Sequence, residues 1–143
     1  MNNKALILDS SVIAKWFFVE NESDNALIIK EKFTNNKISI SVPLLLYYEI
    51  NNLLKTAVKK YRIEEQDAIK VYKAFLQLNF ITYSSEFLLQ KTLEIAIKYD
   101  ISSYDATYIA LSEYLQIQFL TADQKLLKKT QSKLVVDLKD YSF

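Results

Sequence analysis

Short apolar runs alternate along the chain with longer stretches in which apolar residues recur every three or four positions. The short runs are typical of buried strands, and the longer stretches are typical of amphipathic helices. Strands are predicted at residues 5–8, 38–42, 80–83, 119–122 and 134–138. Helices are predicted at residues 12–18, 23–33, 43–60, 64–78, 85–99, 103–115 and 123–129. This order predicts an α/β sandwich with a mainly parallel central sheet, formed by one domain covering residues 1–143.

Several residues mark where these helices should begin. Ser23 is an expected N-cap, and Ser102 or Ser103 is expected to cap the helix that runs to about Leu115. The one proline, Pro43, suits the first turn of a helix. The helix at 64–78 has its apolar residues at helical spacing, and these are Ala68, Val71, Tyr72, Phe75 and Leu76.

Composition narrows the chemistry that such a domain could perform. The chain has no cysteine and no histidine, which excludes thiolate sites, a Ser-His-Asp triad and the usual zinc ligand. It has no glycine, which excludes the common Gly-rich phosphate loops. Carboxylates, hydroxyls, lysines and tyrosines therefore have to carry any chemistry.

Net charge and hydropathy bear on partners and on location. The formal net charge is +1, so a polyanion would have to be held by a local lysine patch or through a bound metal. The N-terminal apolar stretch is too short for a signal peptide, and no apolar run approaches the roughly 20 residues of a membrane span. We expect a cytoplasmic protein with no membrane association.

Three acids follow strands or open helices. Asp9 comes directly after the strand at 5–8, Asp123 comes just after the strand at 119–122, and Asp105 falls in the first turn of a helix. Each alone is explained by helix capping or by the helix dipole. In a parallel sheet, however, ligands bind beyond the carboxyl ends of the strands, which is where Asp9 and Asp123 are expected to lie.

A fourth acid, Glu49, is harder to explain by local structure. It shares a helix face with Leu45, Leu46 and Leu53. A carboxylate on such a face is costly unless it is paired or bound to a cation. A buried lysine, a tyrosine hydroxyl or a metal ion could each stabilise it.

Together, four segments of the sequence resemble one family. They are LDSSVIAKW (8–16), YYEINNLL (47–54), SSYDATYIALSEYL (102–115) and FLTADQKLL (119–127). This pattern is similar to the PIN-domain ribonucleases, especially the VapC-like toxins of toxin–antitoxin pairs. The resemblance covers nearly the whole chain, although family members usually contain glycines in their loops and this chain has none.

The resemblance implies a three-layer α/β/α fold with a parallel sheet. It also implies an acidic pocket at the carboxyl edge of that sheet, formed by Asp9, Glu49, Asp105 and Asp123. Ser11 and Thr121 match the hydroxyl positions beside the pocket. The family also implies Mg²⁺ or Mn²⁺, hydrolysis of RNA phosphodiester bonds, a homodimer and a cognate antitoxin that blocks the site.

Elementary electrostatics agrees with a metal at such a pocket. Two carboxylates about 4 Å apart repel by about 4 kcal/mol at an effective dielectric near 20, and hard oxygen ligands suit Mg²⁺ or Mn²⁺. We expect Asp9 and Asp105 to be the main metal ligands, with Glu49 and Asp123 binding a second ion or orienting water. The lysines expected to contact RNA phosphates are Lys15, Lys125, Lys128 and Lys129, each of which could equally lie on a solvated helix face.

The aromatic run at residues 16–18 leads to a further expectation. Three consecutive aromatics cannot all face inward from one short helix, so one of Trp16, Phe17 and Phe18 is expected at a surface or interface.

Three other interpretations of the sequence stay open. The first is a PIN-like domain that binds RNA or a partner without catalysis. The second is an RNA-processing or structure-specific nuclease outside toxin–antitoxin systems. The third is a phosphoacceptor signalling domain, which would need an acid at the end of a middle strand that ISISVP and FITYSS do not supply.

Overall fold

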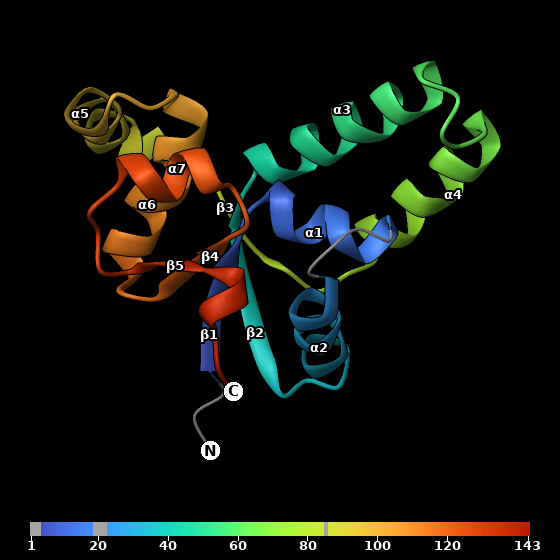
Figure 1. Cartoon of the computed structure of the whole chain (residues 1–143), viewed down its shortest axis with the longest axis horizontal. Helices are drawn as coiled ribbons and strands as arrows, with labels where there is room; N and C mark the ends of the chain where they lie inside the picture. Colours follow the sequence, from blue (N-terminus) through green and yellow to red (C-terminus); the bar gives the residue numbers. More distant parts are fainter. Residues whose placement is uncertain (1–3, 19–22, 85) are drawn as a thin grey trace.

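The computed structural model describes residues 4–18, 23–84 and 86–143 (Figure 1). Within these residues, the strands form one parallel sheet in the order β3-β2-β1-β4-β5. The strands are β1 (Lys4–Leu8), β2 (Ile38–Pro43), β3 (Ile81–Tyr83), β4 (Gln118–Thr121) and β5 (Val135–Asp137). The prediction of a mainly parallel central sheet is confirmed.

Helices cover both faces of this sheet. They are α1 (Ser10–Phe17), α2 (Ser23–Thr34), α3 (Leu45–Lys59), α4 (Glu65–Leu76), α5 (Leu89–Tyr99), α6 (Ser103–Leu115) and α7 (Gln124–Lys129), with the 3₁₀ turns η1 (Glu86–Leu88) and η2 (Leu138–Asp140). Figure 1 shows α1 to α4 on one side of the sheet and α5, α6 and α7 on the other. The three-layer α/β/α architecture is therefore as predicted.

The strand order brings β1 and β4 together at the centre of the sheet. From β1 the chain passes to β2 and β3 on one side, and it then crosses to β4 and β5 on the other. Leu8 of β1 is in register with Leu120 of β4, so the two strands end at the same edge. A point where the strand order reverses is where parallel α/β sheets form their sites.

The middle strands are buried because helices pack against both of their faces. Leu6, Ile7 and Leu8 of β1 and Phe119 and Leu120 of β4 have no exposed surface. This explains why β1 reads as a continuous apolar run and lacks the alternation of a half-exposed strand.

Two predicted helix starts differ in the structure. Pro43 is the last residue of β2, in register with Tyr83, and α3 begins at Leu45, so the prediction that Pro43 opens the helix is wrong. The sheet continues past the proline because the next residue, Leu44, donates its backbone N–H to the Tyr83 carbonyl at 2.9 Å. The helix predicted at 85–99 is a 3₁₀ turn followed by α5, and its first residue, Ser85, lies outside the described residues.

The other predicted helices match closely. Ser102 is the N-cap of α6, where its hydroxyl accepts from the Asp105 N–H. The helix α2 begins at Ser23 itself, whose side chain lies outside the described part of the chain, so its capping role stays a prediction. In α4, Ala68 and Phe75 are buried as expected, whereas Leu76 at the end of the helix is 49% exposed.

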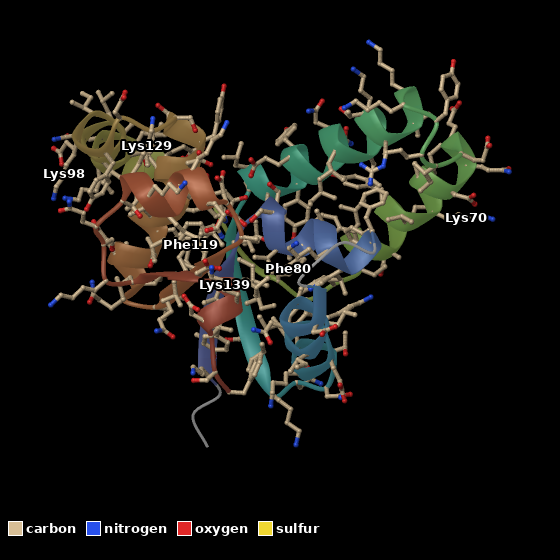
Figure 2. The ribbon with its side chains drawn as sticks, viewed as in Figure 1. Lys70, Phe80, Lys98, Phe119, Lys129 and Lys139 are labelled. Atoms are coloured by element: carbon tan, nitrogen blue, oxygen red, sulfur yellow. The ribbon has the colours of Figure 1, made fainter. Side chains whose placement is uncertain are left out.

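The aromatic run at 16–18 packs inward, and none of its three side chains is largely exposed. Trp16 is buried, donates its indole N–H to the Ala26 carbonyl at 2.9 Å and stacks against Phe80. Figure 2 shows Phe80 between α1 and α2. Phe17 and Phe18 are half-buried against the core. Because α4 covers Phe17 and the α3–α4 turn covers Phe18 only in part, both keep some exposed surface, and a role of either at an interface stays a prediction.

Several helices end in the left-handed conformation that glycine usually supplies. In this glycine-free chain those positions are held by Asn36, Tyr61, Asp100 and Gln116, all with φ between 53° and 57°. For Asn36, Tyr61 and Asp100, backbone hydrogen bonds from this residue and the next close the helix end as in a Schellman motif. Ordinary residues can serve as glycine substitutes here, at a cost in free energy.

Candidate functional site

Asp9 lies where β1 passes into α1, at the central edge of the sheet. Its Oδ1 accepts from the backbone N–H of Ser11 at 3.1 Å and of Val12 at 3.3 Å, so Asp9 does cap α1. A cap needs only one carboxylate oxygen. The second oxygen, Oδ2, accepts from the Thr121 hydroxyl of β4 at 2.6 Å. The side chain is only 6% exposed, and this degree of burial exceeds what capping requires.

Two hydroxyls fix the Asp9 carboxylate from opposite sides. Ser11 Oγ donates to Oδ1 at 2.5 Å and itself accepts from the Ala122 N–H at 3.0 Å. Thr121 Oγ1 donates to Oδ2 and accepts from the Asp123 N–H at 3.1 Å. The network joins the ends of β1 and β4, so the carboxylate has one orientation.

Burial gives Asp9 an unusual ionisation behaviour. Loss of water raises its pKa from 3.8 to about 6. The hydrogen bonds from Ser11, Thr121 and Val12 oppose that rise, and the charge of Asp105 adds to it. Without a cation, this carboxyl therefore keeps its proton to a higher pH than an ordinary aspartate does.

Glu49 faces the same edge from α3. Burial raises its pKa to about 7, the hydrogen bond from Tyr108 lowers it, and the charges of Asp9 and Asp105 raise it further. The Tyr108 hydroxyl, on α6, donates to Glu49 Oε1 at 2.5 Å. Of the partners that the sequence left open for Glu49, the structure supplies the tyrosine hydroxyl. Burial, followed by the charge of Glu49, in turn raises the pKa of Tyr108 well above its usual value.

Asp105 and Asp123 are the other two acids of this site. Burial, followed by the charge of Asp123, raises the pKa of Asp105, and the hydrogen bond with Ser102 lowers it. Asp123 caps α7, since its Oδ1 accepts from Lys125 N–H at 3.0 Å and from Leu126 N–H at 3.1 Å. The charges of Asp9 and Asp105 act on Glu49, the charge of Asp105 acts on Asp9, and the charge of Asp123 acts on Asp105. The four acids predicted from the sequence are therefore near one another at this edge of the sheet.

These acids do not enclose a single point. Among the residues that the structure describes, no group of three or more acidic side chains makes a ready-made metal cage. The donor set nevertheless fits Mg²⁺ or Mn²⁺, because all its ligand atoms are oxygens and Mg²⁺ keeps several waters beside one or two carboxylates. Burial, and to a smaller extent charge repulsion, raises the pKa values of Asp9, Glu49 and Asp105, and a bound cation would offset both effects.

The predicted phosphate-binding lysines lie in two different environments. Lys125, Lys128 and Lys129 line a cleft of about 380 Å³ together with Asp105 and Asp123. Lys129, labelled in Figure 2, also donates to the Asp100 carbonyl at 2.9 Å. Lys15 is only 9% exposed on α1, so it is far less accessible to a phosphate than the other three.

Sequence reasoning missed Tyr108. It lies three residues after Asp105, so the two side chains share a face of α6. The spacing from Asp105 could have pointed to Tyr108, but a tyrosine within an apolar helix is usually a core residue. Tyr108 does also pack in the core, where it stacks on Phe119 with 5.4 Å between ring centroids.

Replacing Tyr108 with phenylalanine removes the hydrogen bond to Glu49 and preserves the stacked ring. We expect about a 10-fold weaker affinity for Mn²⁺, since partners that orient a metal-binding carboxylate typically contribute this much. A Mn²⁺ titration of this variant and of the matched variant Tyr104→Phe, on an exposed side chain of the same helix, checks the prediction. Equal affinities for the two variants would show that Tyr108 only packs.

The fold and the four neighbouring acids together define a class of protein: a parallel α/β domain with an acidic site where the strand order reverses. The family model of the PIN domain matches residues 6–132. The chain belongs to the PIN-domain family, as the sequence motifs indicated.

Individual relatives agree with this assignment. The chain is 27% identical over 128 residues to ribonuclease VapC3 of Pyrobaculum aerophilum, which covers 87% of this chain and 93% of that protein. The solved structure of PAE2754 from the same organism has a TM-score of 0.70 at 22% identity, covering 95% of this chain and 84% of that one. A toxin–antitoxin complex from Klebsiella pneumoniae has a TM-score of 0.63 at 16% identity, covering 93% and 97% respectively. At these identities the two structures show the fold alone.

The expectation about membranes has one structural counterpart. None of the helices in the described ranges is long and apolar enough to cross a bilayer.

Proposed function

We propose that this chain is a Mg²⁺- or Mn²⁺-dependent endoribonuclease and the toxin of a VapBC-type toxin–antitoxin pair. The observation that carries the proposal is the buried Asp9, oriented by Ser11 and Thr121 at the junction of β1 and β4 with three further acids beside it. The ribonuclease relative VapC3, which matches nearly the full length, supports RNA as the substrate.

In this proposal Asp9 and Asp105 are the main metal ligands, and Glu49 and Asp123 bind a second ion or orient water. The bound metal supplies a more acidic water and neutralises charge on the phosphate. Ser11 and Thr121 keep both oxygens of Asp9 in place. Tyr108 occupies Glu49 Oε1, which leaves Oε2 to accept a hydrogen bond from water. Lys125, Lys128 and Lys129 line the cleft beside Asp105 and provide positive charge for the RNA backbone.

Cleavage of a panel of structured and single-stranded RNAs tests the activity, with Mg²⁺, with Mn²⁺ and with EDTA. DNA of the same sequences serves as the control for substrate class. We expect cleavage of RNA that depends on the metal. Cleavage confined to DNA, or a folded protein that neither cuts any RNA nor binds Mn²⁺, would contradict the proposal.

The partners in this proposal are a cognate antitoxin and a second copy of the chain. An antitoxin is suggested by the likeness to the toxin–antitoxin complex. The dimer is suggested by an apolar stripe on α5, where Leu89, Leu93 and Ile97 recur every four residues and are 56%, 56% and 72% exposed. Stripes of this kind are typical of interfaces.

Replacing Ile97 with glutamate should therefore convert a dimer into a monomer, because the carboxylate would be buried at the contact. Size-exclusion chromatography with light scattering measures the mass of both forms, and Lys98→Glu on the neighbouring position is the control. A wild-type chain that is already monomeric at high concentration would contradict the proposed dimer, and it would leave the proposed nuclease activity unaffected.

A further inference from the structure

A second cleft leads away from the acids along α3. It has a volume of about 390 Å³ and lies between α1, α3 and the turn that follows α3. Glu49 lies at one end, Lys60 and Arg62 lie at the other, and Asn52 and Thr56 line the wall between them. Positions 49, 52, 56 and 60 share one face of the helix. One wall of the cleft is thus a polar path from the acidic site to two cations, roughly 16 Å along the helix. The remaining wall is apolar and is formed by Ala14, Phe18, Leu53 and Ala57.

The cationic end of this path is the tip of a helical hairpin. Figure 1 shows α3 and α4 projecting together from the body of the molecule, with their turn at the far end. Arg62 is held there by its guanidinium, which lies over the Phe18 ring with 5.0 Å to the ring centroid. A contact with an aromatic ring leaves the N–H groups of arginine free to bind phosphate oxygens.

Tyr61, between the two cations, is unusual in both its exposure and its backbone. Its side chain is 96% exposed, the highest value among the large apolar and aromatic residues of the described chain. Its φ is 57°, a left-handed conformation that disfavours bulky residues. The turn itself is an ordinary Schellman end, with Tyr61 N–H to Val58 O at 3.0 Å and Arg62 N–H to Ala57 O at 2.9 Å. Glycine would fit this position better, so the needs of folding do not explain the tyrosine.

We infer that this tip binds single-stranded RNA, with backbone phosphates on Lys60 and Arg62 and one base stacked on Tyr61. An exposed aromatic beside cations is how proteins hold single strands without sequence preference. The polar path to Glu49 would place the same strand at the acidic site, while the lysines of α7 flank that site on the other side. RNA is favoured over a protein partner because one wall of the cleft offers the polar Asn52 and Thr56 and leads to the cationic Lys60 and Arg62. The inference rests on the proposed ribonuclease function and adds a substrate-binding element to it.

Binding is measured by fluorescence anisotropy with a labelled oligouridylate of about 15 nucleotides, with Ca²⁺ as the only divalent cation and the RNA checked for integrity afterwards. Tyr61→Ala should weaken binding about 10-fold, whereas Tyr61→Phe should bind like the wild type because the ring still stacks. Removing both cations, in Lys60→Ala with Arg62→Ala, should lower the slope of log affinity against log salt by about 1.4.

Tyr61→Gly separates RNA binding from folding. Glycine relieves the left-handed backbone, so this variant should melt a few degrees higher while binding RNA about as weakly as Tyr61→Ala. Matched controls are Tyr104→Ala, an exposed tyrosine on α6, and Lys70→Ala, which lies on the outer side of α4 in Figure 2. Both controls should bind RNA like the wild type.

Two results overturn the inference, and they are distinguishable. If the wild type cleaves RNA and the Tyr61→Gly and double-cation variants bind the oligouridylate as tightly as it does, the tip is not an RNA site, and the ribonuclease proposal stands. If the wild type neither binds nor cleaves RNA, both proposals fail together.

Discussion

Replacing Asp9 with asparagine should lower metal-dependent RNA cleavage by more than about 100-fold. Residues that only orient a metal ligand contribute about 10- to 100-fold, and a direct ligand should contribute more. The asparagine keeps a side-chain oxygen that can accept the backbone N–H groups of Ser11 and Val12. The cap of helix α1 is therefore preserved, and the helix should form normally. The measurement is the initial rate of cleavage in Mn²⁺, with circular dichroism to compare the folds.

An acid far from the site gives the matched control. Asp67, in the first turn of α4, is exposed, and Asp67→Asn should cleave RNA at the wild-type rate. A folded Asp9→Asn variant that keeps more than about a tenth of the wild-type rate would exclude Asp9 as a main metal ligand.

The stability of the metal-free protein should fall as the pH rises from 4 to 7. The pKa of Asp9 is 3.8 ordinarily and about 6 in the folded chain, so between these values the folded state binds a proton that the unfolded state has released. The contribution of the Asp9 proton to the free energy of unfolding is therefore fully present below about pH 4. This contribution, about 3 kcal/mol, is lost as the pH rises through 6. Glu49, with its pKa raised to about 7, acts in the same direction, with a smaller effect because it is partly exposed.

Urea unfolding in EDTA at a series of pH values measures this effect. The Asp9→Asn variant should lose most of the pH dependence and should be the more stable protein at pH 8. Adding Mn²⁺ at pH 8 should restore stability to the wild type, because the ion binds the folded state. If the free energy of unfolding in EDTA changed equally with pH for wild type and variant, a raised pKa of the buried Asp9 carboxylate would be contradicted.

The sequence was sufficient to predict that Asp9 and Asp123 lie at the same edge of the sheet, and the reason is topological. Two buried strands of a parallel sheet each ended near polar residues, and such ends share one edge. The sequence did not show that β1 and β4 are neighbours in register at Leu8 and Leu120, and this pairing produces the hydrogen bond between Asp9 and Thr121.

Other features could not be predicted because they depend on tertiary contacts. Pro43 has the chemistry of a helix start, yet pairing with β3 extends β2 through it. Trp16, Phe17 and Phe18 form one local run, and only the positions of α2, α4 and the α3–α4 turn decide how much of each is covered. In the sequence, Lys15 cannot be told apart from the other predicted phosphate-binding lysines. It is buried because α1 packs against the rest of the domain.

The absence of glycine concealed the helix ends. Glycine normally marks the left-handed residue after a helix, and here Tyr61 and Gln116 take that position with no distinctive signal in the sequence. The exposed ring of Tyr61 at the end of the polar cleft therefore became visible only in the structure.

The most direct test of the central claim, an acidic metal site at the junction of β1 and β4, is the position of Mn²⁺ in crystals of the protein. Anomalous scattering at the manganese edge locates the ion independently of any activity assay. We expect a peak about 2.2 Å from carboxylate oxygens of Asp9 and Asp105. Manganese bound only elsewhere, with no peak beside Asp9 at saturating concentration, would contradict the claim.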